Sequence, residues 1–183
     1  TQRLVFSWKN DSSLGTQPPT GLDNIVLTTL TGTPLSGNYT IDNTQPTGGT
    51  NYASFTAAIT ALNGNGSAVG GVTFNVVAGQ TFIENPPAIA PSSCSMNPPF
   101  IFQRSGLGAN PVVKPTGGTG TADFGLCISG TDQVTIDGID VTINTGSAVE
   151  YGILVRNLSA TDGAQNNTIK NCTLTGTGET ILR

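Results

Sequence analysis

The chain has 183 residues, and charged side chains make up only 10% of them, against roughly a quarter in an average soluble protein. The formal net charge is −4 with only 7 Lys and Arg residues, which argues against the basic face that a nucleic-acid-binding protein needs. Because the sequence contains no histidine, it lacks the commonest general base and the commonest metal ligand. We therefore expect no metal, no other cofactor and no nucleic-acid partner.

The cysteines and the ends of the chain give further expectations. Cys94, Cys127 and Cys172 have none of the spacings typical of a zinc site. Cys127 and Cys172 fall within strand patterns, where we expect small buried hydrophobic side chains. The sequence has no run of 18 apolar residues, so we expect no membrane-spanning segment. It starts without methionine or a signal peptide, and we expect it to be a piece of a longer polypeptide.

Residues 1–30 are expected to hold two strands, Arg3–Trp8 and Ile25–Leu30, joined by a turn-rich loop. Two strands cannot fold by themselves. The string RLVFSWKNDSSLGTQPPTGLDNIVLT resembles the C-terminal end of jelly-roll β-sandwich modules in large surface proteins of Bacteroidetes. This resemblance implies the end of a β-sandwich, and a strand pair docked on the next module is the alternative. Residues 31–37 (TGTPLSG) have the composition of a linker.

The stretch after the linker contains the only convincing helix. Its stripe of Phe55, Ala58, Ile59 and Leu62 has helical spacing, with Thr50 or Asn51 as the expected N-cap and Asn63-Gly64 as the expected end. Because a stack of β-coils has an open end that is usually covered, we expect this helix to cap the stack.

Short strand patterns follow the helix. The expected strands are Val72–Val77, TFIE after Gly79, Phe100–Gln103 and Val112–Lys114. The Pro- and Ser-rich segment 85–99 can form neither a helix nor a central strand.

Two stretches then repeat one pattern. Asp132–Ile143 (DQVTIDGIDVTI) aligns with Asn166–Gly176 (NNTIKNCTLTG), so that Ile136 matches Ile169, 33 residues later. Phe124–Gly130 aligns with Tyr151–Asn157 at an offset of 27, so the second copy carries a longer loop. Short β-branched strands that recur at this period and are broken by Gly, Asn and Asp predict a solenoid of stacked β-coils.

The segment from LSGNYTID through the helix and VTFNVV to NNTIKNCTLTG resembles a pectate-lyase-like β-helix module that recurs in long, secreted Bacteroidetes proteins. We therefore expect an all-β fold, with residues 38–183 forming the capped N-terminal coils of a right-handed parallel β-helix. The resemblance also implies an extracellular or cell-surface location and export by the type IX secretion route.

Enzymes with this fold cleave acidic polysaccharides with clustered carboxylates, which bind Ca²⁺ or flank a glycosidic bond. The acids available on the repeat region are Asp123, Asp132, Asp137, Asp140, Glu150 and Asp162. Asp137 aligns with Lys170, and Asp140 aligns with Thr173, so no carboxylate row continues between coils. We expect Asp137 and Lys170 to form an exposed ion pair, and we assign no catalytic residue.

Two other polar features carry little functional signal. Asn171 suits a turn in which asparagines stack between coils, but its counterpart one coil earlier is Gly138, which breaks such a row. Tyr39, Tyr52 and Tyr151 form no evident platform for stacking a sugar.

These observations leave three hypotheses. The first is a structural and adhesive module of a large bacterial surface or secreted protein, with a glycan or the secretion machinery as partner. The second is a polysaccharide lyase or glycoside hydrolase whose active coils lie beyond Arg183. The third is a filament or surface-layer subunit.

Overall fold

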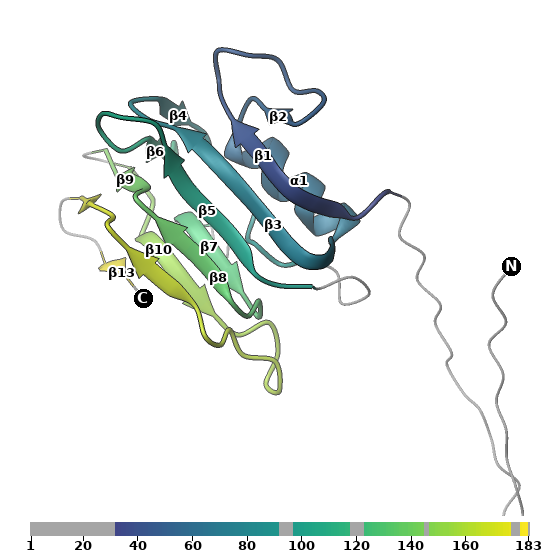
Figure 1. The fold of residues 1–183 in the computed structure, drawn as a ribbon. Helices are drawn as coiled ribbons and strands as arrows, with labels where there is room; N and C mark the ends of the chain where they lie inside the picture. The colour runs from purple at the N-terminus through teal and green to yellow at the C-terminus, as the bar shows by residue number, and fades with distance from the viewer. Residues whose placement is uncertain (1–31, 92–96, 118–122, 145–146, 177–179, 183) are drawn as a thin grey trace, which may run out of the picture.

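The computed structural model describes residues 32–91, 97–117, 123–144, 147–176 and 180–182. They form a parallel β-solenoid of about four turns with a single helix at one end, which confirms the predicted all-β, helix-capped architecture (Figure 1). The predicted β-sandwich strands of residues 1–30 lie outside the described residues. No helix among the described residues is long and apolar enough to cross a membrane.

Three parallel sheets make up the walls of the solenoid, and we name them A, B and C. Sheet A has the strand order β11-β8-β5-β3-β1-β2, sheet B the order β12-β9-β6-β4, and sheet C the order β13-β10-β7. The strands of sheet A are β1 (Leu35–Ile41), β2 (Asn51–Tyr52), β3 (Ser67–Val77), β5 (Phe100–Ser105), β8 (Val134–Asp137) and β11 (Thr168–Lys170). Sheet B consists of β4 (Thr81–Ile83), β6 (Val112–Lys114), β9 (Asp140–Thr142) and β12 (Leu174–Thr175). Sheet C consists of β7 (Phe124–Ser129), β10 (Tyr151–Arg156) and β13 (Thr180–Leu182).

The chain passes from sheet A to B to C and then begins the next coil. In the first coil, a single residue takes the place of the sheet C strand, because Ile89 forms a parallel bridge with Ile128. Its backbone N–H donates to the Cys127 carbonyl at 2.8 Å, and its side chain is 1% exposed. The proline-rich segment 85–99 was predicted to contain no central strand. It nevertheless contributes this one bridge to sheet C.

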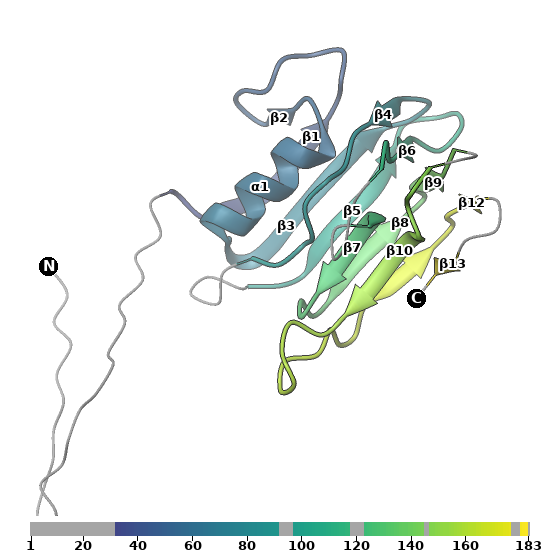
Figure 2. The same cartoon turned by 180° about the vertical axis from the view of Figure 1, so that it is seen from behind.

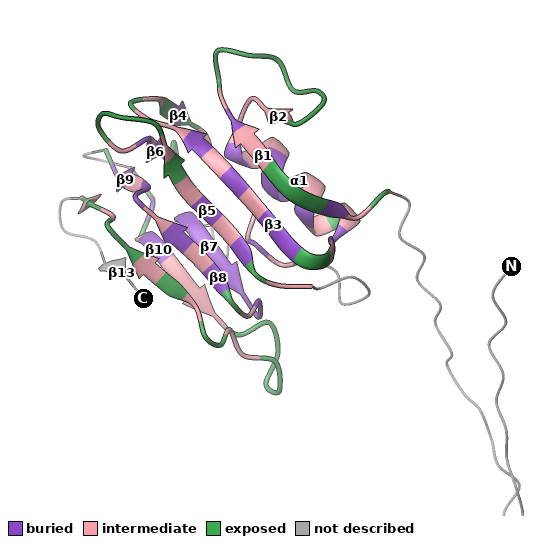
Figure 3. Cartoon of the chain, viewed as in Figure 1, coloured by how far each residue is buried: buried purple, intermediate pink, exposed green. Residues whose placement is uncertain are grey.

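Alternation along the strands of sheet A separates the core from the surface. Along β3, buried residues alternate with half-buried ones from Val72 onward (Figure 3). The inward row runs through Tyr39, Phe74, Phe102, Ile136 and Ile169, paired in register across five strands. The Phe74 and Phe102 rings are stacked with 4.7 Å between their centroids. Each coil thus covers the apolar row of the one before it.

The pairing of strands confirms the alignment of the repeat. Ile136 pairs with Ile169 between β8 and β11. Val141 pairs with Leu174 between β9 and β12, and Tyr151 pairs with Phe124 between β10 and β7. The extra residues of the second copy lie between β10 and β11, in a loop that folds back through a Ser159–Asp162 bridge.

Helix α1 (Phe55–Asn65) lies behind β1 and β3 in Figure 1 and in front of them in Figure 2. Its predicted stripe is buried, and the Phe55 ring meets the Phe82 ring edge-on at 5.1 Å, so the helix closes the end of the core as expected. The predicted caps are wrong by several residues. Ser54 is the N-cap, since its Oγ accepts from the Ala57 N–H, and the helix continues to Asn65 before Gly66.

The two residues predicted to cap the helix are used by the neighbouring sheet. Asn51 belongs to β2 and pairs with Thr40 of β1, whose N–H donates to the Thr50 carbonyl at 2.8 Å. The last three residues of the expected linker, 35–37, belong to a strand. Strand β1 begins at Leu35, which is 5% exposed and donates its N–H to the Gly66 carbonyl.

One glycine marks a close approach between the walls of the solenoid. A Cβ on Gly125 of β7 would lie 2.5 Å from Val141 Cγ1 and 2.7 Å from the Gly152 carbonyl oxygen, and the latter cannot move aside because it is backbone. We expect Gly125→Ala to lower the free energy of unfolding by about 1–3 kcal/mol through overpacking.

The matched control is Gly64→Ala in α1, where a Cβ meets nothing within 4 Å. This variant should raise stability by about 0.5–1 kcal/mol, because alanine favours the helix. Urea unfolding of both variants measures the difference. Equal stability of the two variants would contradict the packing described here.

Candidate functional site

The outer face of sheet A carries a continuous polar row along the solenoid axis. We call it the ladder, and it consists of Thr40, Asn75, Gln103, Asp137 and Lys170, in register from β1 to β11. A second outward row runs beside it through Asn38, Thr73, Ile101, Thr135 and Thr168. Four of these second-row side chains are polar and one is apolar, so the face offers hydrogen bonds across five strands.

Hydrogen bonds between coils hold the side chains of the ladder. Gln103 Nε2 donates to Asn75 Oδ1 at 2.9 Å, and Asn75 Nδ2 donates to the Tyr39 carbonyl at 3.4 Å. Further along, Lys170 Nζ lies 3.3 Å from Asp137 Oδ2, which confirms the predicted ion pair. The side chain of Lys170 is 53% exposed, so the pair contributes well under about 1 kcal/mol to stability.

At the corner where sheet A turns into sheet B, the ladder borders a hollow of about 220 Å³ that we call the corner hollow. It is lined by Gln103, Arg104, Asn110, Asp137, Gly138 and Asn171, which come from three successive coils. Gly138 and Asn171 occupy equivalent corner positions and share the left-handed backbone, with φ of 68° and 56°. Glycine and asparagine adopt that conformation most readily, which explains their use at this turn.

The carboxylates beside the corner hollow are held by protein donors. Asn171 Nδ2 donates to Asp137 Oδ1 at 2.7 Å, and this hydrogen bond, with the nearby charges of Lys170 and Arg104, lowers the pKa of Asp137. Asp140 Oδ1 accepts from Asn110 Nδ2 and from the Thr173 N–H, both at 2.7 Å. The side chain of Asn171 thus binds a carboxylate and does not stack on another asparagine.

The other acids on the repeat region are not brought into this cluster. Asp132 Oδ1 accepts from the Gln165 N–H at 2.6 Å, and Asp123 Oδ1 accepts from the Glu150 N–H at 3.1 Å. Asp162 is exposed in the turn after β10. Within the described ranges, no three His, Cys, Asp or Glu residues are grouped as metal ligands would be. Of the predicted candidates, Asp137 lines the corner hollow, and Asp140 is hydrogen-bonded to Asn110 of its lining.

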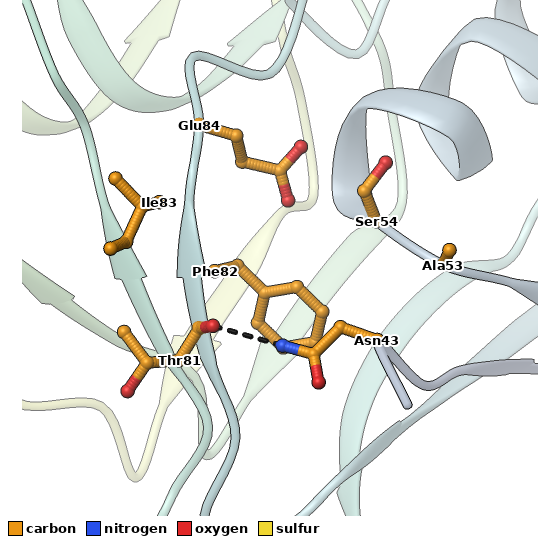
Figure 4. Close-up of a pocket in the computed structure, with 7 residues that line it drawn as sticks. All are labelled: Asn43, Ala53, Ser54, Thr81, Phe82, Ile83 and Glu84. Carbon is orange, nitrogen blue, oxygen red and sulfur yellow. Dashed lines mark hydrogen bonds between the residues drawn. The ribbon is translucent and has the colours of Figure 1, made fainter. Parts of the chain in front are cut away.

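A second hollow, of about 350 Å³, lies between β4 and the start of α1 (Figure 4). Glu84 points from the end of β4 toward the first turn of the helix, where its carboxylate oxygens accept from the N–H groups of Phe55 and Thr56 at 2.9 and 2.8 Å. The Thr56 hydroxyl also donates to this carboxylate. Glu84 therefore serves the helix N-terminus, where negative charge is favourable.

The opposite side of this second hollow protects a strand edge. Strand β4 is the last strand of sheet B, and Asn43 Nδ2 donates to its Thr81 carbonyl at 2.9 Å (Figure 4). A short edge covered by a side chain is a common protection against pairing with other chains. Sequence patterns did not reveal Glu84, Asn43 or Asn110, because each has its partners some 30 or more residues away in the chain.

Two of the tyrosines are part of an aromatic group at the core. Tyr39 and Tyr52 pack against Phe74, with ring centroids 5.8 and 5.9 Å from it. Tyr39, Tyr52 and Phe74 therefore form an aromatic group at the capped end of the core.

The cysteines within the described residues are free thiols. Cys127 is buried in β7, as predicted, whereas Cys172 is half-buried and lies between β11 and β12 rather than in a strand. Burial raises the pKa of Cys127 to about 11. Only about 0.1% of that thiol is ionised at pH 8, and the thiolate is the reactive form.

We therefore expect native Cys127 to resist alkylation by iodoacetamide at pH 8 in a Cys94→Ser background. Denaturation in urea should restore labelling. Peptide mapping by mass spectrometry measures both states, and rapid native labelling of Cys127 would show that β7 is accessible to solvent.

No protein-family model, curated protein or solved structure matches this chain. The parallel β-solenoid, its polar outer face and the corner hollow are thus the observations from which a function can be argued.

Proposed function

We propose that this chain is a structural and adhesive module of a large bacterial cell-surface or secreted protein, and that the outer face of sheet A contacts glycans. The resemblance of the LSGNYTID to NNTIKNCTLTG segment to pectate-lyase-like modules of Bacteroidetes supports the location and export by the type IX route. The observation that carries the glycan contact is the pair of outward rows on sheet A, namely the ladder and the row of Asn38, Thr73, Ile101, Thr135 and Thr168 beside it.

A glycan presents hydroxyl groups along a chain, and each of them can donate and accept hydrogen bonds with a row of fixed polar groups. The ladder supplies such groups at the spacing of neighbouring parallel strands, about 4.8 Å. The coils fix its side chains through the Gln103 to Asn75 and Asn75 to Tyr39 hydrogen bonds. Little rotamer freedom is then lost when a ligand binds.

The distribution of apolar side chains also favours a glycan over a protein partner. The large hydrophobic side chains that are most exposed are Val69, Ile83, Leu107 and Leu158, and none of them belongs to the two outward rows of sheet A. Protein interfaces usually have an apolar or aromatic centre. In these rows Ile101 is the one large apolar residue, and it is half-buried.

Binding without catalysis fits the state of the carboxylates. A glycoside hydrolase needs one carboxyl group to donate a proton and a second to act as base or nucleophile. Near the corner hollow, Asp137 is ionised and bound by Asn171 and Lys170, and Asp140 accepts two hydrogen bonds. The lowered pKa of Asp137 is opposite to what a general acid requires.

Retention on immobilised polysaccharides tests this proposal. We expect the chain to bind at least one polysaccharide, and the double variant Thr73→Ala/Thr135→Ala to bind about tenfold more weakly. The control is Thr142→Ala, which removes a half-buried threonine from a strand of sheet B. This variant should bind as well as the unchanged chain. Failure of the chain to bind any polysaccharide, or equal binding by the double variant, would refute a glycan-contacting face.

A further inference from the structure

The corner hollow is lined by polar and charged side chains and one glycine. Its volume of about 220 Å³ is smaller than that of typical drug-sized pockets, roughly 300–1,000 Å³. It therefore has room for a single ring-sized ligand group. It lies at the end of the outer face of sheet A, beside the ladder residues Gln103 and Asp137.

Three side-chain amides line the hollow, and the nitrogen of each one is already used by the protein. Asn110 Nδ2 donates to Asp140 Oδ1 and to the Asn171 carbonyl, at 2.7 and 2.9 Å. Asn171 Nδ2 donates to Asp137 Oδ1, and Gln103 Nε2 donates to Asn75 Oδ1. These bonds fix the orientation of each amide. Since no described residue donates to the three amide oxygens, they remain as fixed acceptors.

Arg104 supplies donors to the same space. Its Nη1 donates to the Gly108 carbonyl at 2.9 Å, and this is its one hydrogen bond to a described residue. A guanidinium group has five N–H donors, so several stay available. The floor between Arg104 and Asn110 is Gly138, where a Cβ would lie 3.2 Å from Arg104 Cβ and 3.3 Å from Asn110 Oδ1. A side chain at this position would therefore fill part of the hollow.

The charges around the hollow balance. Arg104 and Lys170 give two positive charges, and Asp137 and Asp140 give two negative ones, so the net charge is zero. An anion would meet three amide oxygens and two carboxylates. A cation would meet the guanidinium of Arg104. A neutral group rich in hydroxyls avoids both costs, because each hydroxyl can donate to an amide oxygen and accept from Arg104.

We propose that the corner hollow binds one neutral glycosyl residue of a glycan chain that lies along the outer face of sheet A. This inference rests on the proposed glycan-contacting function and deepens it by naming the class of sugar. The amide oxygens of Gln103, Asn110 and Asn171 accept from its hydroxyls, and Arg104 donates to them.

The test is a titration of the ¹⁵N-labelled chain, followed by NMR, with neutral gluco-, manno- and galacto-oligosaccharides. Parallel titrations use oligogalacturonate and calcium chloride. We expect neutral oligosaccharides to shift the side-chain amide signals of Asn110 and Asn171 and the backbone signal of Gly138. Gly138→Ala should weaken this binding at least tenfold. Gly79→Ala is the matched control, because Gly79 also has a positive φ, of 75°, but a Cβ there meets nothing within 4 Å.

Three results would overturn the proposal. One is that neutral oligosaccharides shift only the NMR signals of residues in the two outward rows of sheet A. Equal affinity of these sugars for Gly138→Ala and Gly79→Ala would count in the same way. Glycan contact would then stand and the hollow would not be its site. Another is that oligogalacturonate or calcium, and not neutral sugars, shifts the hollow signals. If no saccharide shifts any signal, the glycan-contacting function fails together with this inference.

Discussion

Replacing Ile136 by aspartate is expected to lower the free energy of unfolding by more than about 4 kcal/mol, enough to abolish a cooperative transition in a marginally stable domain. Ile136 is 1% exposed and pairs with Phe102 on one side and Ile169 on the other. A carboxylate there would be buried between the Phe102 and Ile169 side chains, which offer no hydrogen-bond donor. Urea unfolding followed by circular dichroism measures the loss.

Thr135→Asp provides the control, because Thr135 is the preceding residue of the same strand and points outward. It should change stability by less than about 1 kcal/mol. The stability lost in Ile169→Asp should be intermediate between the losses in these two variants, since Ile169 is half-buried. If Ile136→Asp were as stable as Thr135→Asp, the inward and outward faces of sheet A would be wrongly assigned.

Glu84→Ala is expected to lower the free energy of unfolding by about 2–3 kcal/mol, which is the second largest effect that we predict. The carboxylate accepts hydrogen bonds from two backbone N–H groups of α1 and from the Thr56 hydroxyl. Hydrogen bonds to charged groups contribute about 1.5–3 kcal/mol each when buried, and this group is half-buried, so the total is smaller than their sum. Thermal unfolding measures the change, and Glu84→Gln should recover part of it because one amide oxygen remains.

Asp132→Ala is the comparison for Glu84→Ala. Asp132 also accepts a backbone hydrogen bond, from Gln165, but this bond is exposed and single. We expect a cost below about 1 kcal/mol. Equal effects of the two variants would mean that α1 does not depend on Glu84, and that the second hollow has a carboxylate free for chemistry.

Much of the solenoid could be predicted because its later coils repeat one pattern in the sequence. The offsets of 33 and 27 residues gave the pairings of Ile136 with Ile169 and of Tyr151 with Phe124, since stacked coils repeat the same inward positions. The helical stripe of α1 was likewise visible as spacing. The start of strand β1 was missed because Leu35-Ser36-Gly37 follows Pro34 in a segment with the composition of a linker. It becomes a strand because it pairs with β3 across some 30 residues.

The site could be predicted only in part. The alignment placed Asp137 beside Lys170, and the structure confirms that pair. It could not show that Asn110 bonds Asp140 and the carbonyl of Asn171, 61 residues later, because loop residues have no repeat that fixes their neighbours. Arg104 was missed because the predicted strand ended at Gln103, whereas β5 continues to Ser105. The corner hollow is therefore a product of three coils meeting at one turn.

The most direct test of a binding, non-catalytic module combines binding and turnover on the same polysaccharide panel. The chain is incubated with each polysaccharide, and both the bound fraction and the size of the sugar chains are measured by chromatography. The proposed function predicts bound polysaccharide of unchanged length. Shortened products from the chain, lost on Asp137→Asn, would contradict it and would make the corner hollow an active site.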